Sequence, residues 1–392
     1  MEACPSRTAS GVVENVTVPL ALALGATNLQ VGLLGAFPKL LAALLQLFTP
    51  RLMVLFGGSR RVLYRSAAAG AIAYFAMVLV PLMPEPTRVW GLILLAAVGL
   101  VFVELPNPAW TSWFSSQMPA NRRGRYLALR SSLASITSMG AIIATGVFLD
   151  AFAGRVFLGF GVALAAAGLM RVASAGIFYG VHEQPRATPR AEERDLARFL
   201  RAMSHPNLRR MLFYSFGLQI GGTISGAYFT AYQLQVLEFS YSGLLWPTII
   251  ATASGIVGLQ VWGRMGDRSG NLLPIRSAAI GIALLPILWI WVQEPFHVAL
   301  INVAGGFLWT GYFLCSGNYL SELALPEDRA SYAAYLTAFN GVASFTGALI
   351  GAGLLAVIPA AGAGAFFALF IVSAIIRLGA ALAFLPKMTD VR

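Results

Sequence analysis

Long apolar stretches, separated by short basic connections, constrain this chain more than any other feature. About 20 consecutive apolar residues are needed for a helix to cross a bilayer, and twelve such segments can be drawn in the 392 residues. Only 11% of the residues are charged, against about 25% in an ordinary soluble domain. The sequence therefore predicts an all-α membrane protein with twelve transmembrane helices. They cover approximately residues 6–24, 29–53, 63–82, 89–117, 127–151, 156–181, 209–236, 242–262, 273–292, 297–324, 332–357 and 364–385.

The longest connection divides these segments into two sets of six. Residues 182–208 contain Pro185, Pro189 and many charges, and Leu196, Phe199, Leu200 and Met203 fall on one helical face. Such a face is typical of a short helix that lies on a membrane surface. We therefore expect two pseudo-symmetric six-helix bundles, residues 1–181 and 209–392, joined by a cytoplasmic linker with an amphipathic helix, residues 182–208.

The basic residues predict the orientation. Most of the 27 Lys and Arg lie in alternate connections and in the C-terminal tail, whereas the opposite connections carry Arg88 and Arg155. Cytoplasmic loops are the ones enriched in Lys and Arg. We therefore expect an integral inner (cytoplasmic) membrane protein with both termini in the cytoplasm.

The two halves carry a weak internal repeat. A shift of 207 residues places Pro119–Gly146 on Pro326–Gly353 and matches Pro119 with Pro326, Arg122 with Arg329 and Gly140 with Gly347. A shift of 206 residues pairs Arg171 with Arg377. Parallel repeats of this kind occur in secondary transporters.

One connection carries a sharp motif. Gly263, Asp267, Arg268 and Gly270 fall between the eighth and ninth segments, where glycines permit a tight turn and the two charges can form a pair. The motif resembles the G-x-x-x-D-R-x-G loop signature of the major facilitator superfamily. The matching stretch after the second segment, Phe56–Arg61, keeps the arginines but lacks the acid.

This resemblance implies a cytoplasmic gate and a central cavity. In the family, arginines before the fifth and eleventh helices and an acid at the end of the tenth bond to the signature; here these are Arg122, Arg329 and Glu322. Helices 1, 4, 7 and 10 line the cavity in the family. The residues that we expect there to bind substrate or couple transport are Glu14, Glu104, Asn107, Gln219, Tyr228, Tyr232, Trp309, Tyr312 and Asn318.

Ionisable residues at membrane depth are functional candidates. Glu14 and Lys39 each lie about ten residues from the outer end of consecutive antiparallel segments, roughly 15 Å deep. We therefore expect an ion pair, either structural or involved in proton coupling. Glu104 also lies near mid-depth, and Pro106 and Pro108 behind it should weaken the helix and free backbone carbonyls.

These features favour a secondary active transporter of a small organic solute that works by alternating access, coupled to a proton or another ion. The alternative is a transporter-like membrane protein without transport activity, such as an assembly or pigment-related factor. The chain has no phosphate-binding loop or catalytic motif, so we expect no enzymatic activity. We also expect no cofactor, no metal and no nucleic-acid partner, and a monomer in the bilayer.

Overall fold

The computed structural model describes residues 3–46, 48–117, 120–180, 203–226, 228–323, 329–358 and 363–390. These residues are almost entirely helical, and no strand occurs among them. They form two compact units, which are described separately. Unit 1 comprises Met1–Glu193 and Ser240–Ser242, and unit 2 comprises Arg194–Phe239 and Gly243–Arg392. The predicted linker falls mostly on residues outside the described part, so its helix remains a prediction.

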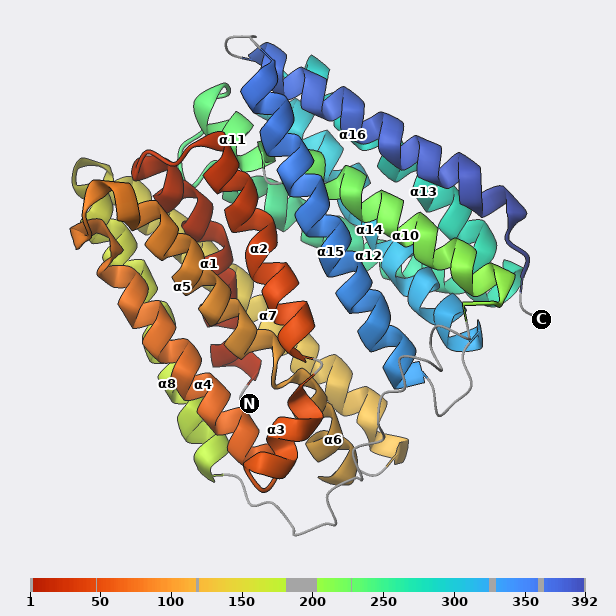
Figure 1. Ribbon diagram of the computed structural model, residues 1–392, viewed down its shortest axis with the longest axis horizontal. Coiled ribbons are helices and arrows are strands. Elements are labelled where there is room, and N and C mark those ends of the chain that lie inside the picture. The colour runs from red at the N-terminus through yellow and green to blue at the C-terminus, as the bar shows by residue number, and fades with distance from the viewer. Residues whose placement is uncertain are drawn as a thin grey trace. The chain divides into compact units, whose positions relative to one another are not determined.

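Each of the twelve predicted segments contains at least one helix (Figure 1). The helices of unit 1 are α1 (Ala3–Ala23), α2 (Asn28–Gln46), α3 (Thr49–Leu55), α4 (Ser59–Val78), α5 (Glu85–Glu104), α6 (Asn107–Gln117), α7 (Ala120–Ala151) and α8 (Val156–Gly180). The helices of unit 2 are α10 (Pro206–Gly226), α11 (Tyr228–Gln235), α12 (Leu245–Ser269), α13 (Leu272–Leu288), α14 (Pro295–Leu323), α15 (Arg329–Val357) and α16 (Ala363–Phe384).

The two units pair their helices in the same order. In unit 1, α1 packs against α7 and α8, α4 packs against α5 and α8, and α2 packs against α5. In unit 2, α10 packs against α15 and α16, α13 packs against α14 and α16, and α12 packs against α14. The weak sequence repeat therefore corresponds to a repeated fold, in which α8 and α16 are the last helices of their units.

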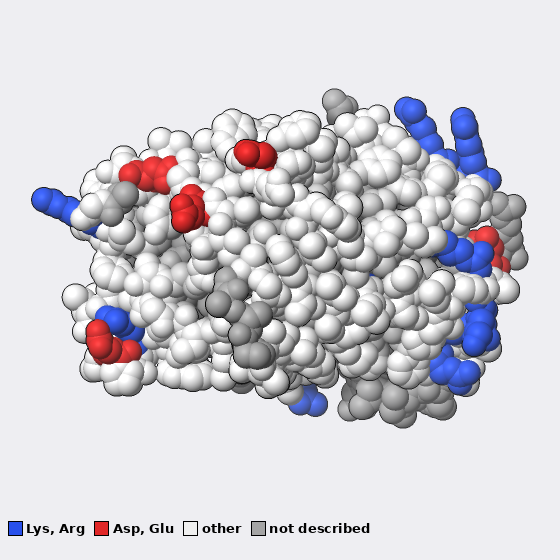
Figure 2. Space-filling view, turned by 90° about the horizontal axis from the view of Figure 1, so that it is seen from above, with Lys and Arg blue, Asp and Glu red and all other residues white. Residues whose placement is uncertain are grey.

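Nine helices in the described residues are long and apolar enough to cross a membrane. The helices at the other three predicted positions are α1, α4 and α10, which carry charges such as Glu14, Arg65 and Arg210. Figure 2 shows one face of the molecule on which uncharged residues dominate and most Lys and Arg side chains gather at the right-hand edge. A broad uncharged surface is what a bilayer requires.

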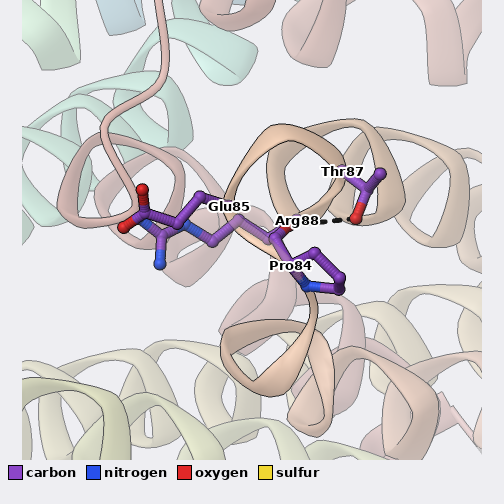
Figure 3. Close-up of polar contacts among 4 residues, drawn as sticks. All are labelled: Pro84, Glu85, Thr87 and Arg88. Atoms are coloured by element: carbon purple, nitrogen blue, oxygen red, sulfur yellow. Dashed lines mark hydrogen bonds and ion pairs between the residues drawn. The ribbon is translucent and has the colours of Figure 1, made fainter.

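The start of α5 shows how a basic residue outside the expected cytoplasmic loops is accommodated. Arg88 forms an ion pair with Glu85, with 3.1 Å between Nη2 and Oε1 (Figure 3). The hydroxyl of Thr87 donates to the carbonyl of Pro84 at 3.0 Å. Pro84 and Pro86 favour a helix start here, because the first turn needs no backbone donors. The charge of Arg88 is thus compensated within one turn of helix.

The prediction of a loop at the signature motif was wrong in its extent. Gly263 to Ser269 continue α12, and the connection to α13 consists of Gly270 and Asn271. Gly270 has a φ of 81° and its N–H bonds to the carbonyl of Gly266. One glycine at the turn is enough to end the helix, so the preceding residues stay helical.

Two glycines of α15 permit close packing against α10. A Cβ at Gly347 would come within 2.4 Å of the carbonyl oxygen of Ile220, and one at Gly351 within 2.6 Å of that of Ile224. At the repeat-related Gly140 in α7, nothing lies within 4 Å of a Cβ in the described residues. Close approach between α1 and α7 occurs instead at Gly11, where a Cβ would clash with Ser138.

Candidate substrate and coupling sites

Charged groups of α1, α2 and α5 in unit 1 interact with one another. Glu14 in α1 interacts electrostatically with Lys39 in α2 and with Arg7 in α1. Glu104, at the end of α5, interacts electrostatically with both Glu14 and Arg7. Sequence reasoning did not place Glu104 beside Glu14, and it did not include Arg7. The result is a cluster of two carboxylates and two cations, which we name the charged cluster: Arg7, Glu14, Lys39 and Glu104.

The predicted ion pair between Glu14 and Lys39 is not formed. Both side chains are exposed, and within the described residues no salt bridge joins them. Lys39 follows Pro38 inside α2, and its long side chain can extend away from the helix rather than bond to a single partner. The two charges therefore influence each other at a distance without direct contact.

The helix is interrupted directly after Glu104, as Pro106 and Pro108 predict. α5 ends at Glu104, Leu105 and Pro106 form a turn, and α6 begins at Asn107. Across this break the amide of Asn107 donates to Oε2 of Glu104 at 2.7 Å. The buried hydroxyl of Thr49, at the start of α3, lies 2.6 Å from the carbonyl oxygen of Leu105. The break therefore presents a hydrogen-bonded carboxylate and amide at the charged cluster.

Neutral polar side chains connect three helices of unit 2. Ser215 in α10 donates to Oδ1 of Asn340 in α15 at 2.9 Å. The hydroxyl of Tyr312 in α14 donates to Ser215 at 3.3 Å, and Gln219 donates to Ser344 at 3.1 Å. The sequence-based list includes Gln219 and Tyr312 but not Asn340 and Ser344, because α15 was not among the expected cavity helices. It also omits Ser215 in α10, a small polar residue that does not stand out in its segment. Only the contacts between helices reveal these three.

Aromatic rings continue this group along α14. Trp309 lies edge-on to Tyr312 with 6.0 Å between ring centroids, and it stacks on Phe313 at 5.4 Å. Phe313 and the predicted Asn318 are exposed, and Trp309 is half-buried. A flat aromatic surface beside amide and hydroxyl groups suits a solute with a ring and several hydroxyl groups.

Two predicted cavity residues lie in the packed interior of unit 2. Tyr228 and Tyr232 are fully buried. The ring of Tyr232 lies edge-on to Trp289, Phe366 and Phe370, with centroids 5.5 to 6.1 Å apart. These contacts favour a packing role for Tyr232, and burial favours the same role for Tyr228.

Among the gate residues whose side chains are described, the expected charge pairs do not form. Within the described side chains, Asp267 and Arg268 are exposed and take part in no ion pair. Glu322, at the end of α14, accepts a hydrogen bond at 2.7 Å from the amide of Asn271, the residue that precedes α13. The side chains of Arg122 and Arg329 lie outside the description. The described link between the signature and α14 is thus Asn271 to Glu322, rather than a charge pair.

The C-terminal tail also contacts the end of the signature. Asp390 accepts a hydrogen bond from the backbone N–H of Leu272 at 3.3 Å, at the start of α13. Asn207 donates to the hydroxyl of Thr389 at 2.9 Å, and the hydroxyl of Tyr319 donates to the carbonyl of Thr389 at 2.8 Å. Arg276 donates to the carbonyls of Leu385 and Met388. The tail therefore ties the adjoining ends of α10, α13 and α14 together.

The sequence of this helical chain matches the sequence model of a protein family. The model describes the Major Facilitator Superfamily and matches residues 8–317. The chain belongs to the Major Facilitator Superfamily. The twelve helical segments and the repeated helix pairing of the two units agree with this family. The chain is therefore a secondary transporter in the membrane. This favours the transport reading over the alternative of a transporter-like protein without transport.

Solved structures of transporters share the fold. A mutant form of the nucleoside transporter NupG matches with a TM-score of 0.79 and 12% identity, over 99% of this chain and 98% of that one. A D-xylose–proton symporter matches with a TM-score of 0.70 and 15% identity, over 100% and 95%. A bacterial homologue of the human lysosomal transporter Spinster matches with a TM-score of 0.69 and 12% identity, over 98% and 93%.

A curated relative matches a small part of the sequence. The multidrug resistance protein MdtG of Dickeya zeae (strain Ech586) is 28% identical over 92 residues. These residues make up 23% of this chain and 22% of that protein. The match is too short to indicate a substrate.

Proposed function

We propose that this transporter moves a small polar organic solute across the inner membrane in exchange for, or together with, a proton. The charged cluster of unit 1 is the observation that carries the proposal. Two ionised carboxylates close together repel each other, and binding of a proton by either one relieves that repulsion. Glu14 and Glu104 are thus the groups that we assign to proton coupling, with Arg7 and Lys39 as the nearby cations.

Unit 2 supplies the groups that we assign to the solute. Gln219, Trp309, Tyr312 and Asn318 offer amides, a hydroxyl and an aromatic face, and no acidic or basic side chain is among them. A neutral solute with hydroxyl groups is best suited to such a set, because neutral hydrogen bonds avoid the cost of burying an unpaired charge. Two of the structural neighbours, a nucleoside transporter and a D-xylose–proton symporter, support this class.

The proposal includes the membrane arrangement. The distribution of Lys and Arg supports cytoplasmic termini, bundles over residues 1–181 and 209–392 and a cytoplasmic linker over residues 182–208. Each unit has its own packed core, which supports a monomer that needs no partner to fold.

Transport by purified protein in proteoliposomes tests the proposal. An imposed proton gradient should drive accumulation of a labelled nucleoside or pentose, and Glu14→Gln should abolish accumulation while exchange of solute across the membrane continues. Glu294→Gln is the matched control, since it neutralises an exposed acid outside the charged cluster and outside the gate. Accumulation by Glu14→Gln at the wild-type pH dependence would exclude Glu14 as the coupling group. Accumulation of lipophilic cations in place of sugars would instead favour drug transport.

A further inference from the structure

Two buried arginines have no assigned role in transport. Arg171 in α8 and Arg377 in α16 are 3% and 4% exposed. Within the described residues neither forms a salt bridge with a carboxylate. An unpaired guanidinium at membrane depth is costly, so its hydrogen bonds must compensate.

Each arginine bonds to a carbonyl that a proline has left without a partner. In a helix the N–H of residue i bonds to the carbonyl of residue i−4, and proline has no N–H. Pro106 therefore leaves the carbonyl of Phe102 free, and Nη2 of Arg171 donates to that oxygen at 3.0 Å. Pro286 likewise leaves the carbonyl of Ile282 free, and Nη1 of Arg377 donates to it at 3.1 Å.

The second nitrogen of each arginine donates to a serine of the first helix in the same unit. Nη1 of Arg171 lies 2.8 Å from the hydroxyl of Ser6 in α1. Nη2 of Arg377 lies 3.2 Å from the hydroxyl of Ser225 in α10. Glycines make room, since a Cβ at Gly70 would come within 3.1 Å of Arg171 and one at Gly221 within 2.6 Å of Arg377. The device is thus repeated in both units.

The two copies differ in what lies beside them. Phe102 is two residues before Glu104, so Arg171 holds the turn that presents Glu104 and Asn107. Ile282 lies inside α13, which continues past Pro286 to Leu288 without a break, and each arginine has a tyrosine as its electrostatic neighbour, Tyr74 for Arg171 and Tyr214 for Arg377. Glu104 interacts electrostatically with Arg7 and Glu14 in α1 and with Tyr74 in α4. Lys39 in α2 reaches this group through Glu14, and Arg171 in α8 reaches it through Tyr74.

We propose that Arg171 is a positioning residue for proton coupling, and that it acts by bonding the carbonyl of Phe102 at the break between α5 and α6. Arg377 is the structural counterpart, which stabilises a proline-containing helix without acting on the coupling site. That Arg171 stabilises the break between α5 and α6 does not depend on the proposed function. That Arg171 influences proton coupling rests on the proposed function of Glu14 and Glu104.

A double-mutant cycle on the purified full-length protein tests the link to the proline. Pro106→Ala supplies an N–H for the carbonyl of Phe102, so Arg171→Met should lower the melting temperature much less in that background than in the wild type. Arg171→Met combined with Pro286→Ala is the control, and the two effects should add. If Arg171→Met does not fold, Arg171→Lys takes its place in the same cycle. Additive effects of Arg171 and Pro106 would overturn the proposal.

The pH dependence of uptake separates positioning from stability. Arg171→Met, or Arg171→Lys, should shift the midpoint of the pH profile by ~0.5 unit or more. Arg377→Met should lower the melting temperature but leave the midpoint in place. Equal midpoints in both variants and in the wild type would leave Arg171 as a structural residue only. If the wild type shows no pH dependence at all, the proposed coupling fails, and the cycle still decides whether Arg171 serves the proline break.

Discussion

The carboxylate of Asp390 lies where a side chain on Gly270 would have to be. A Cβ at Gly270 would come within 2.8 Å of Oδ1 of Asp390, and the same oxygen accepts the N–H of Leu272. The second glycine of the signature is therefore needed for two reasons, its positive φ and the carboxylate against it.

Gly270→Ala should destabilise unit 2. Gly270 has φ 81° and ψ 165°, a region that other residues enter at a cost of ~1–3 kcal/mol. Gly263→Ala is the matched control in the same signature, because Gly263 is helical and the nearest atom to a Cβ there is 3.9 Å away. Unfolding of the purified variants should show a clear loss for Gly270→Ala and no loss for Gly263→Ala. Equal losses would contradict this assignment.

Removal of Asp390 should partly rescue the glycine substitution. In Asp390→Ala the steric part of the Gly270→Ala cost disappears and the backbone part remains. The double variant should therefore be more stable than the sum of the two single effects predicts. Comparison of the four melting temperatures measures this coupling, and strict additivity would show that the tail does not occupy the turn.

Lys39→Met should cost little stability. Breaking a buried ion pair from one side typically costs ~3–5 kcal/mol, but Lys39 is exposed and has no direct partner in Glu14. We expect a loss below ~1 kcal/mol, together with an altered pH dependence of uptake because a cation near Glu14 has been removed. A loss of several kcal/mol in unfolding experiments would indicate a direct pair after all.

The stability of the gate, at the adjoining ends of α13 and α14, should depend more on Asn271 than on Asp267. Asn271→Ala removes the hydrogen bond to Glu322 and should destabilise the C-terminal end of α14 by about 0.5–1.5 kcal/mol. Asp267→Asn changes an exposed side chain without an ion pair and should stay within about 0.5 kcal/mol of the wild type. Hydrogen exchange at the ends of α13 and α14 reports the difference. The reverse order would restore the charge pair as the main link.

Reporter fusions check the orientation. Fusions after residues 58, 124, 190, 270, 330 and 392 should report the cytoplasm, and fusions near residues 27, 86, 153, 239, 295 and 361 should report the periplasm, because Lys and Arg are retained inside. Two neighbouring fusions on opposite sides that give the same answer would show that the number of spans is wrong.

The helices were predictable from the sequence because lipid leaves an apolar segment few alternatives to a helix. The break after Glu104 was also predictable, since Pro106 and Pro108 remove two helical donors. The end of α12 was not, because Gly263, Gly266 and Gly270 look alike in sequence, and the turn forms only where a positive φ is used.

The candidate site was predictable by residue type and depth but not by contacts. Glu14, Lys39 and Glu104 stand out as charges in apolar segments, yet their spacing along the chain does not reveal that Glu104 lies near Glu14. The roles of Arg171 and Arg377 were hidden for the same reason. Each bonds to a carbonyl on another helix, and a backbone oxygen leaves no trace in the sequence.

The two-residue connection between α12 and α13 has a mechanical consequence. α12 has 25 residues, which gives a length of about 37 Å, more than the roughly 30 Å of hydrocarbon that it has to cross. Its end can therefore project beyond the lipid and join α13 at a corner that Asp390 stiffens. Because the connection is short, a small tilt of α12 would move the end of α12 and the start of α13 sideways together. The C-terminal tail, which is bonded to the start of α13 through Asp390, would move with them.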